Sequence, residues 1–499
     1  ISICAFQGLK GRRKECDLLM KYRCKMCDYI YDEEEMGKKF SELEDYDCPM
    51  CHAPKKLFEQ IDTLQEIKSS KRIFKKAVLF SDDNKGVEKD DAKCIDCGIC
   101  KATCISKCGL NFGEDTSKCL ECGQCISACP TNALKPKRHI ERVKDAMASG
   151  KVMVCYTSPA IRVSIGEVFG YAPGTFLQGK LIGLLRKLGF LYVLDTTFGA
   201  DLTIMEEATE LKNRLENNGV LPMFTSCCPA WVKYAETFYS DLLPHLSTCK
   251  SPIGMEGEIV KHYFSKKMDI SEEDLYTVAI TPCTAKKFEL QREEIEGTDA
   301  VITVSELADW IKEEQISFEE IEESHFDSLL GEGSGAGVIF GSTGGVCEAA
   351  LRSLYYFITG EDYQEAHLNF SDVRGYDNVK EATVTINGKE VKVAVIHKIS
   401  AIKPILEEVK NGTSSYQFIE VMNCQGGCVG GGGQPKYPEE MEKQTKEKRM
   451  EGLYQRDNET TVKAAYQNPD IQKLYQEFLT KPGGTLAHHY LHTTYQKRG

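Results

Sequence analysis

Two short cysteine runs constrain the fold of this chain more than any other feature. They read CIDCGICKATC and CLECGQCISACP, and both follow the pattern CxxCxxCxxxC. In segments with this spacing, the first three cysteines of one run and the last cysteine of the other run bind the same 4Fe-4S cluster. The repeat therefore predicts two clusters, one bound by Cys94, Cys97, Cys100 and Cys129, the other by Cys119, Cys122, Cys125 and Cys104. Zinc is a poorer interpretation, because two interleaved runs are among the most specific metal-binding patterns.

The overall composition agrees with metal binding in a reducing compartment. The chain has 499 residues and 23 cysteines, most of them in short CxxC arrays. Disulfide frameworks are typical of small exported domains, so thiols in a long acidic chain favour bound metal. The net charge of -13 argues against a nucleic-acid partner. No apolar run is long enough to span a bilayer and no signal peptide is recognisable, so we expect a soluble, cytoplasmic protein.

A further cysteine array lies near the start of the chain, in YRCKMCDYIYDEEE and YDCPMCHAPKKLF. Its two CxxC knuckles can supply four thiolates to one tetrahedral metal, namely Cys24, Cys27, Cys48 and Cys51. The letters YIYD and CP around the knuckles resemble rubredoxin, which implies a mononuclear iron site for electron transfer. A structural zinc site is the alternative, because four thiolates do not distinguish the two metals.

The chain is expected to be multidomain, with α+β and α/β parts. We predict an N-terminal segment (1–20), a rubredoxin-like knuckle domain (21–60), a linker (61–88), a two-4Fe-4S ferredoxin-like domain (89–137) and a large domain (138–499). In the large domain, KVMVCYTSPA, AVITV and VKVAVI are typical of buried strands, while GKLIGLLRKLG and SELADWIKEE have helical periodicity. Alternating strands and helices predict an α/β domain, with two lobes in so long a stretch.

Four cysteines of the large domain lie far apart in the sequence, each in a distinctive loop. The loops read TSCCPAW, TPCTAKKFE and VMNCQGGCVGGGGQP, and they carry Cys228, Cys283, Cys424 and Cys428. Four thiolates from separate loops can hold a 4Fe-4S cluster inside a core. The glycines between 426 and 433 let the backbone approach a bulky ligand closely. A flexible linker is the alternative for a glycine run, but a linker would not normally carry two thiols.

These three loops resemble the signature motifs of FeFe-hydrogenases. In that family the active site is the H-cluster, a 4Fe-4S cubane joined through one cysteine to a diiron unit with CO, cyanide and azadithiolate ligands. The resemblance implies a two-lobed H-cluster domain in which Cys228, Cys283, Cys424 and Cys428 bind the cubane. Cys428 would also bridge to the diiron unit.

The paired thiols of TSCCPAW then take different roles. Neighbours on an extended backbone point to opposite sides, so Cys227 does not reach the iron that Cys228 binds. By resemblance, Cys227 passes protons to the bridging amine, a task that suits a thiol because it gives and accepts protons more readily than a hydroxyl. The alternative is a buried spectator cysteine.

A proton route is suggested by DLTIMEEATELKNRL. Glu207, Glu210 and Arg214 are spaced i, i+3 and i+7, which aligns them on one helical face. A solvated face with an ordinary Glu210–Arg214 pair is the alternative. In the family, matching carboxylates and a serine that matches Ser247 relay protons, so the resemblance implies the same relay here.

The resemblance also implies the wall of the diiron pocket. Lys286 matches a lysine that contacts a cyanide ligand, and such a cation would form a charge-assisted hydrogen bond in a dry site. The other matching positions are Pro159, Ala160, Thr281, Phe340 and Met422. Ala160 stands where serine is usual and Thr281 where methionine is usual, and such changes affect reaction bias and oxygen tolerance.

The expected activity is reversible reduction of protons to dihydrogen. Electrons would come from an external carrier such as ferredoxin, and maturation proteins would install the diiron unit. An iron-sulfur assembly or electron-transfer protein without that unit is the alternative from another class, and a hydrogen sensor is a third. The shuttle thiol and the acid relay favour the enzyme. No site is assigned to His488, His489 and His492, because isolated histidines are commoner than metal ligands.

Overall fold

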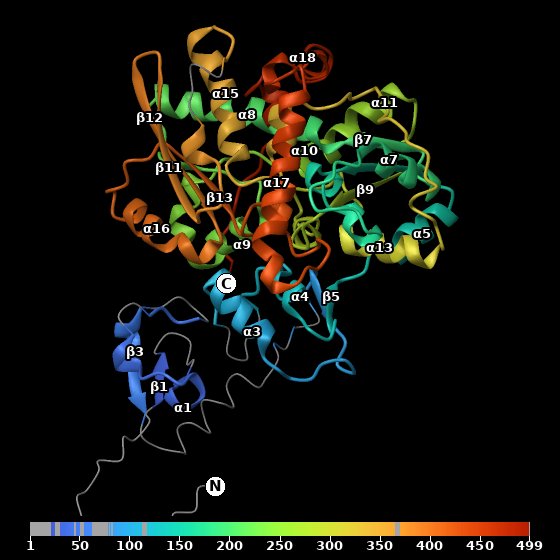
Figure 1. Cartoon of the computed structure of the whole chain (residues 1–499). Helices are drawn as coiled ribbons and strands as arrows, with labels where there is room; N and C mark the ends of the chain where they lie inside the picture. The colour runs from blue at the N-terminus through green and yellow to red at the C-terminus, as the bar shows by residue number, and fades with distance from the viewer. Residues whose placement is uncertain are drawn as a thin grey trace, which may run out of the picture. The chain divides into compact units, whose positions relative to one another are not determined.

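The chain divides into two units, residues 1–76 and 77–499. The structure, a computed structural model, describes residues 21–24, 30–43, 46–49, 54–61, 78, 80, 83–111, 117–364 and 370–498 (Figure 1). Among the helices in these ranges, none is long and apolar enough to cross a membrane.

The first unit contains a small antiparallel sheet with the strand order β2-β1-β3. Its strands are β1 (Lys21–Cys24), β2 (Ile30–Asp32) and β3 (Phe58–Ile61), with a short helix α1 (Glu33–Met36). Phe40 stacks on Tyr22 with ring centroids 4.4 Å apart and packs against Phe58 at 5.0 Å. Aromatic packing of this kind gives a small domain much of its core.

The side chains of Cys24 and Cys48 are fully buried in this unit. Cys27 and Cys51, the other two predicted ligands of the N-terminal metal site, lie outside the described residues. The rubredoxin-like site therefore stays a prediction.

The second unit begins with the segment that carries the two cysteine runs. Strand β4 (Val87–Lys89) pairs antiparallel with β5 (Leu134–Pro136). Each run has a short helix, α3 (Ile99–Thr103) or α4 (Gln124–Ala128). A glycine with positive φ precedes each helix, Gly98 at 76° and Gly123 at 68°. Glycine suits this left-handed turn, and the repeated CG dipeptide is its signature in the sequence.

The first sheet of the large domain is wholly parallel, with the order β10-β9-β6-β7. Its strands are β6 (Val152–Thr157), β7 (Tyr192–Asp195), β9 (Leu275–Thr281) and β10 (Ala300–Thr303). Met153 and Cys155 of β6 pack in one buried cluster with residues of α5 (Ile140–Ala148), α7 (Gln178–Lys187) and α13 (Val304–Glu313). The alternate residues Val154 and Tyr156 pack in another cluster with α8 (Thr196–Glu216) and α10 (Pro252–Ile259). Both faces are covered, which explains why these strands are continuous apolar runs in the sequence.

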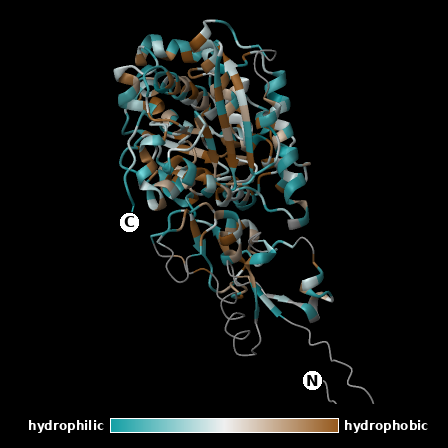
Figure 2. Ribbon diagram, turned by 90° about the vertical axis from the view of Figure 1, so that its left-hand side faces the viewer, coloured by the Kyte–Doolittle hydropathy of each residue, from teal (hydrophilic) through white to brown (hydrophobic). Residues whose placement is uncertain are grey.

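The second sheet has the order β11-β12-β13-β8 and is mixed. Its strands are β11 (Val379–Ile386), β12 (Lys389–His397), β13 (Phe418–Met422) and β8 (Met223–Phe224). Asn387 and Gly388 both have positive φ in the tight turn that joins β11 to β12, as expected for an Asn-Gly hairpin. Helix α15 (Gly345–Thr359) contributes to the core cluster that includes Val393, and α16 (Lys403–Lys410) to the cluster that includes Ala394. In Figure 2 the hydrophobic residues concentrate in the interior strands and the hydrophilic ones on the outer helices.

The remaining helices join these two halves. They are α6 (Pro159–Arg162), α9 (Pro229–Phe238), α11 (Ser265–Lys267), α12 (Lys286–Glu289), α14 (Gly335–Ile339), α17 (Glu442–Glu459), α18 (Pro469–Leu474) and α19 (Thr485–Leu491). Helix α17 crosses the front of the domain between the two sheets in Figure 1. The mixed α/β fold and the strands and helices predicted from the sequence are confirmed.

Helix α17 is tied to α15 by a buried ion pair. Arg352 donates to both carboxylate oxygens of Asp457, at 3.0 and 2.7 Å, and also pairs with Glu348. All three side chains are at most 3% exposed. A bidentate pair in this position fixes α17 against α15.

We expect Arg352→Ala to destabilise the protein by about 3–5 kcal/mol, because it leaves the buried Asp457 carboxylate without its cation, while Glu348 keeps its pair with Arg374. Anaerobic thermal unfolding measures the loss. Arg138→Ala is the matched control, since Arg138 pairs with Glu141 and Glu313 at the surface and should contribute less than about 1 kcal/mol. Equal melting temperatures for the two variants would contradict the prediction.

Candidate active site

A cavity forms where loops from both sheets meet. It lies beyond the carboxyl ends of parallel strands β6, β9, β13 and β8, the edge where sites in α/β folds usually occur. The lining of the cavity is overwhelmingly apolar. Every residue that the sequence assigns to the diiron pocket lines it, namely Pro159, Ala160, Thr281, Lys286, Phe340 and Met422.

Four thiols that are distant in the sequence line the same cavity: Cys228, Cys283, Cys424 and Cys428. Burial raises the pKa of Cys428 to about 12, and burial also raises the pKa of Cys228. Apolar surroundings thus disfavour free thiolates, and a bound metal cluster would supply the positive charge that they need. The donor set and its burial fit an iron-sulfur cluster.

Glycine lets the Cys424–Cys428 loop approach the opposite wall. Gly427 has φ at +87°, and a Cβ there would lie 2.6 Å from the backbone nitrogen of Thr343. Any other side chain would clash with that wall, so the glycine is needed for a close approach as well as for the turn.

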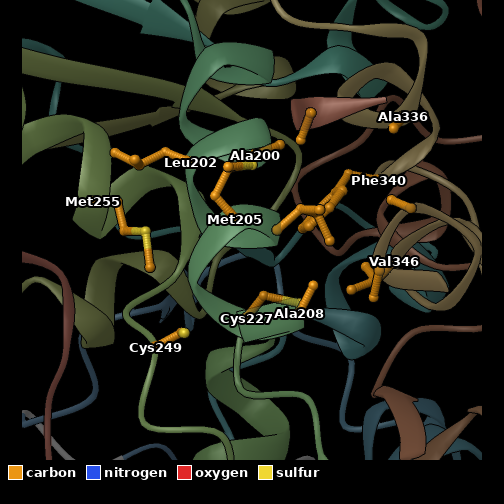
Figure 3. Close-up of a cluster of buried hydrophobic side chains, with 14 of the residues drawn as sticks. Ala200, Leu202, Met205, Ala208, Cys227, Cys249, Met255, Ala336, Phe340 and Val346 are labelled. Carbon is orange, nitrogen blue, oxygen red and sulfur yellow. The ribbon is translucent and has the colours of Figure 1, made fainter. Parts of the chain in front are cut away.

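The adjacent thiols Cys227 and Cys228 have surroundings that overlap in part. Cys227 belongs to the buried cluster that contains Met205 and Ala208 of α8 (Figure 3). Cys228 packs against that cluster and also against the one that contains Trp231, and it accepts the backbone N–H of Asn423 at 3.5 Å. Both thiols line the cavity.

A buried ion pair stands at the cavity wall. The Lys286 ammonium donates to Glu289 Oε2 at 2.7 Å and to the Cys227 carbonyl at 3.2 Å. Burial opposes the lysine charge, but the Glu289 carboxylate outweighs burial and the pKa of Lys286 is raised. Sequence reasoning missed Glu289, although its i, i+3 spacing from Lys286 in KKFE is a recognisable signal.

Glu207 is buried on α8 and both of its carboxylate oxygens lack a hydrogen-bond partner among the described residues. Burial, and then the negative charge of Glu210, raise the pKa of Glu207 to about 8. The carboxyl group is therefore mostly protonated at neutral pH. A solvated charged face, the alternative from the sequence, does not describe this residue.

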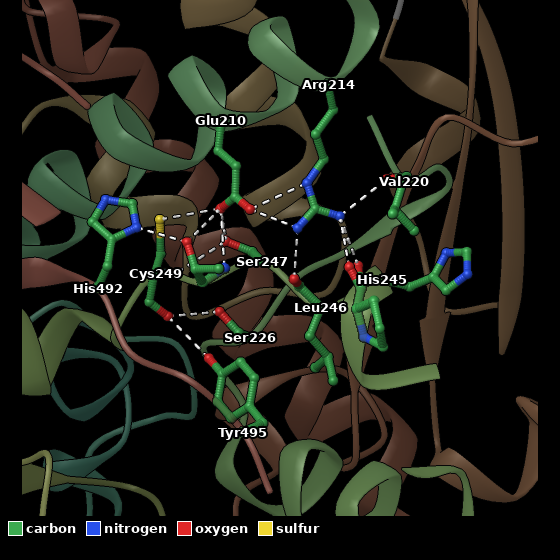
Figure 4. Close-up of polar contacts among 12 residues, drawn as sticks. Glu210, Arg214, Val220, Ser226, His245, Leu246, Ser247, Cys249, His492 and Tyr495 are labelled. Atoms are coloured by element: carbon green, nitrogen blue, oxygen red, sulfur yellow. Dashed lines mark hydrogen bonds and ion pairs between the residues drawn. The ribbon is translucent and has the colours of Figure 1, made fainter. Parts of the chain in front are cut away.

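Glu210 is the centre of a polar network (Figure 4). Its Oε2 accepts Ser247 Oγ at 3.0 Å and the backbone N–H of Thr248 at 3.0 Å. Its Oε1 accepts Arg214 Nη2 at 2.6 Å. Arg214 also donates to the Leu246 carbonyl at 2.8 Å. The structure thus brings together Glu210, Ser247 and Arg214, as the sequence predicts, and places Glu207 one turn deeper on the same helix.

The second of the two cysteine runs contacts a loop of the cavity through Gln124. Cys94, Cys97, Cys100 and Cys129 line one small pocket. Burial raises the pKa of Cys125, and the nearby thiols Cys104, Cys122, Cys119 and Cys100 disfavour its ionisation further. The four predicted ligands of the second cluster are therefore neighbours, and the assignment of each thiol to one cluster stays a prediction.

Gln124 joins the second group to the cavity. Its side-chain amide donates to Cys424 Sγ at 3.2 Å and to the Gly430 carbonyl at 2.9 Å. Because Gln124 lies between Cys122 and Cys125, this contact connects the second run to a thiol of the cavity. The sequence offered no signal for it.

The comparisons with known proteins agree with this arrangement. The profile described as "Iron only hydrogenase large subunit, C-terminal domain" matches residues 151–432. The profile of "Iron hydrogenase small subunit" matches residues 443–498. The profile of a "4Fe-4S binding domain" matches residues 114–135.

Among similar proteins is "Iron hydrogenase 1" of Clostridium pasteurianum, 44% identical over 74% of this chain and 65% of that protein. The chain thus spans slightly less than two thirds of that relative. "NADP-reducing hydrogenase subunit HndD" of Solidesulfovibrio fructosivorans is 40% identical over 99% of this chain and 81% of that protein. "Protein NAR1" of Arabidopsis thaliana is 31% identical over 72% of this chain and 81% of that protein. The solved structure of "[FeFe]-hydrogenase HydA1 from Chlamydomonas reinhardtii", variant E141A, matches with a TM-score of 0.63 and 38% identity, over 71% of this chain and 98% of that chain.

Proposed function

Since the chain belongs to the iron-only hydrogenase family, we propose that it catalyses the reversible reduction of two protons by two electrons to dihydrogen. One observation carries the proposal. A single buried cavity holds four candidate cluster ligands, a fifth thiol that is free for proton transfer, and a lysine that is held by an ion pair. The apolar lining of the cavity would keep water away from a bound cofactor, which protects a reactive centre and strengthens every charge beside it.

Cys228, Cys283, Cys424 and Cys428 would hold the cubane of an H-cluster, with Cys428 shared with the diiron unit. When bound, this cofactor supplies the redox centre at which protons and electrons combine. Lys286 presents its ammonium group to the cavity, where it would donate to an anionic ligand such as cyanide. Pro159, Ala160, Phe340 and Met422 exclude water, and Thr281 adds a hydroxyl to the wall.

Protons would move along α8 between the surface and the cavity. Arg214 holds the Glu210 carboxylate in place, and Ser247 donates to the same carboxylate. Glu207 holds a proton at neutral pH and is close enough to interact electrostatically with both Glu210 and Cys227. Cys227 is the last group of the chain on this route, because it belongs to the α8 cluster and also lines the cavity.

Electrons would enter through the clusters of the two cysteine runs, supplied by an external carrier such as a ferredoxin. The contact of Gln124 supports this electron path, because its side-chain amide connects the second cysteine run to Cys424. The role of the N-terminal metal site, the need for maturation proteins and a cytoplasmic location also belong to this proposal.

Infrared spectroscopy of the matured, anaerobic protein tests the proposal. We expect bands from metal-bound CO and cyanide, and dihydrogen formation by the same sample with a chemical electron donor. Protein produced without maturation factors is the control and should show neither. Absence of the bands and of dihydrogen despite confirmed maturation would instead favour an iron-sulfur assembly role, since the chain is also similar to the NAR1 protein.

A further inference from the structure

Three potential metal ligands meet at the outer end of the Glu210 network. Glu210 comes from α8, Cys249 from the loop before α10, and His492 from the residue after α19. One ligand atom of each lies within 4.8 Å of the other two. Cys249 Sγ lies 3.9 Å from Glu210 Oε2 (Figure 4). These residues are separated widely in the sequence, so only the fold brings them together.

We infer that this cluster binds a divalent transition-metal ion of the zinc class, and that the bound ion inhibits turnover by occupying the Glu210 carboxylate. The inhibitory part rests on the proposed proton route. A set of one imidazole, one thiolate and one carboxylate is typical of zinc. In tetrahedral zinc sites, bonds of about 2.0–2.3 Å place ligand atoms about 3.3–3.6 Å apart, close to the separation found between Cys249 and Glu210.

The surroundings favour a cation and leave it accessible. A solvent-connected pocket borders the cluster and is lined by Glu206, Glu210, Arg214, His488 and His492, among others. Glu206 and Glu210 carry two negative charges against one from Arg214. Because Glu210 and His492 also line this pocket, water from it would complete the tetrahedron around a bound ion.

Binding would rearrange contacts that the structure records. His492 Nδ1 lies 2.7 Å from Thr248 Oγ1, and Thr248 Oγ1 donates to Glu210 Oε2 at 3.3 Å. The Cys249 thiol would lose its proton to solvent as the zinc–sulfur bond forms, so binding releases a proton and strengthens as pH rises. Glu210 Oε2 is the atom that accepts from Ser247, and once an ion occupies it the carboxylate no longer exchanges protons there.

Zinc chloride is the probe for a direct test. Anaerobic crystals of the whole protein are soaked in it, and anomalous maps above and below the zinc edge are compared. We expect a zinc peak bounded by Glu210, Cys249 and His492, absent in His492→Gln. No peak there, in crystals that show zinc elsewhere, would overturn the site.

Inhibition is measured on the same preparation with the H-cluster installed. The zinc concentration for half-inhibition should rise at least about 10-fold in His492→Gln. It should be unchanged in the control His489→Gln, whose side chain is exposed and packs on Tyr490. A chelator should restore the rate of the wild type.

The two ideas fail in different ways. If the protein forms no dihydrogen even without zinc, the proposed function fails, while the crystallographic peak still decides the site. If dihydrogen forms normally and zinc inhibits the wild type and His492→Gln equally, the inhibitory role of this site is wrong.

Discussion

Cys227→Ala is expected to lower dihydrogen turnover by about 10²- to 10⁴-fold, the usual contribution of a positioned acid–base group. Cys227 lines the cavity and also packs against α8, so it is the group through which a proton on that helix would reach the cavity. Alanine keeps the fold and removes the exchangeable proton. Dihydrogen evolution, normalised to iron content and to the infrared bands of the diiron unit, measures the effect.

Cys155→Ala is the matched control for this variant. Cys155 is another fully buried thiol, but it packs on the opposite face of the parallel sheet and does not line the cavity. Its loss should leave the rate within a few-fold of the wild type. If Cys227→Ala kept the full rate with the diiron unit installed, the proton role of Cys227 would be wrong.

The second large effect is expected for Glu207→Gln. Glutamine keeps the shape of the side chain but neither accepts nor releases a proton at neutral pH, so turnover should fall by about 10²-fold or more. Glu256→Gln is the control, because Glu256 is also a buried glutamate on a core helix with no hydrogen-bond partner among the described residues. It does not line the cavity and should keep most of the activity.

The raised pKa of Glu207 also predicts how the free energy of unfolding changes with pH. Its pKa is raised from 4.5 to about 8 in the folded protein, so the folded state holds an extra proton between these values. The free energy of unfolding should therefore fall with rising pH in this window, by up to about 1.4 kcal/mol per unit from this group. Glu207→Gln should lack this component and melt at a higher temperature than the wild type at pH 8–9. A variant that melts lower than the wild type throughout would show that the carboxyl group is needed for folding instead.

The regular elements and the cysteine groups were predictable because each depends on local spacing. The apolar runs of β6 and β10 predicted strands buried on both faces, and the CxxCxxCxxxC spacing predicted which thiols would bind a cluster together. The pocket positions came from the resemblance of three loops to a known family, since neither hydrophobic periodicity nor ligand spacing would single out Pro159 or Phe340.

Contacts between distant segments were not predictable from spacing. Glu289 could have been found by its i, i+3 relation to Lys286, but Gln124 reaches Cys424 across about three hundred positions of chain. His492 carried no signal beyond its residue type, and the fold alone places its ring beside Thr248 and Glu206.

The burial of Glu207 shows where sequence periodicity stops being informative. The i, i+3, i+7 spacing of its helix describes a charged face equally well whether that face meets water or protein. The packing of α8 against α10 and α15 determines that this part of the face meets protein. It removes water from the Glu207 carboxyl group and so raises its pKa.

By itself, then, the sequence determined the elements, the thiols that act together and the family, because ligand spacing and local periodicity are properties of neighbouring residues. Only the tertiary structure decided which charges are buried, which thiol both packs against α8 and lines the cavity, and which side chains from separate segments become neighbours. Those depend on exclusion of water and on close packing between parts of the chain that no local pattern relates.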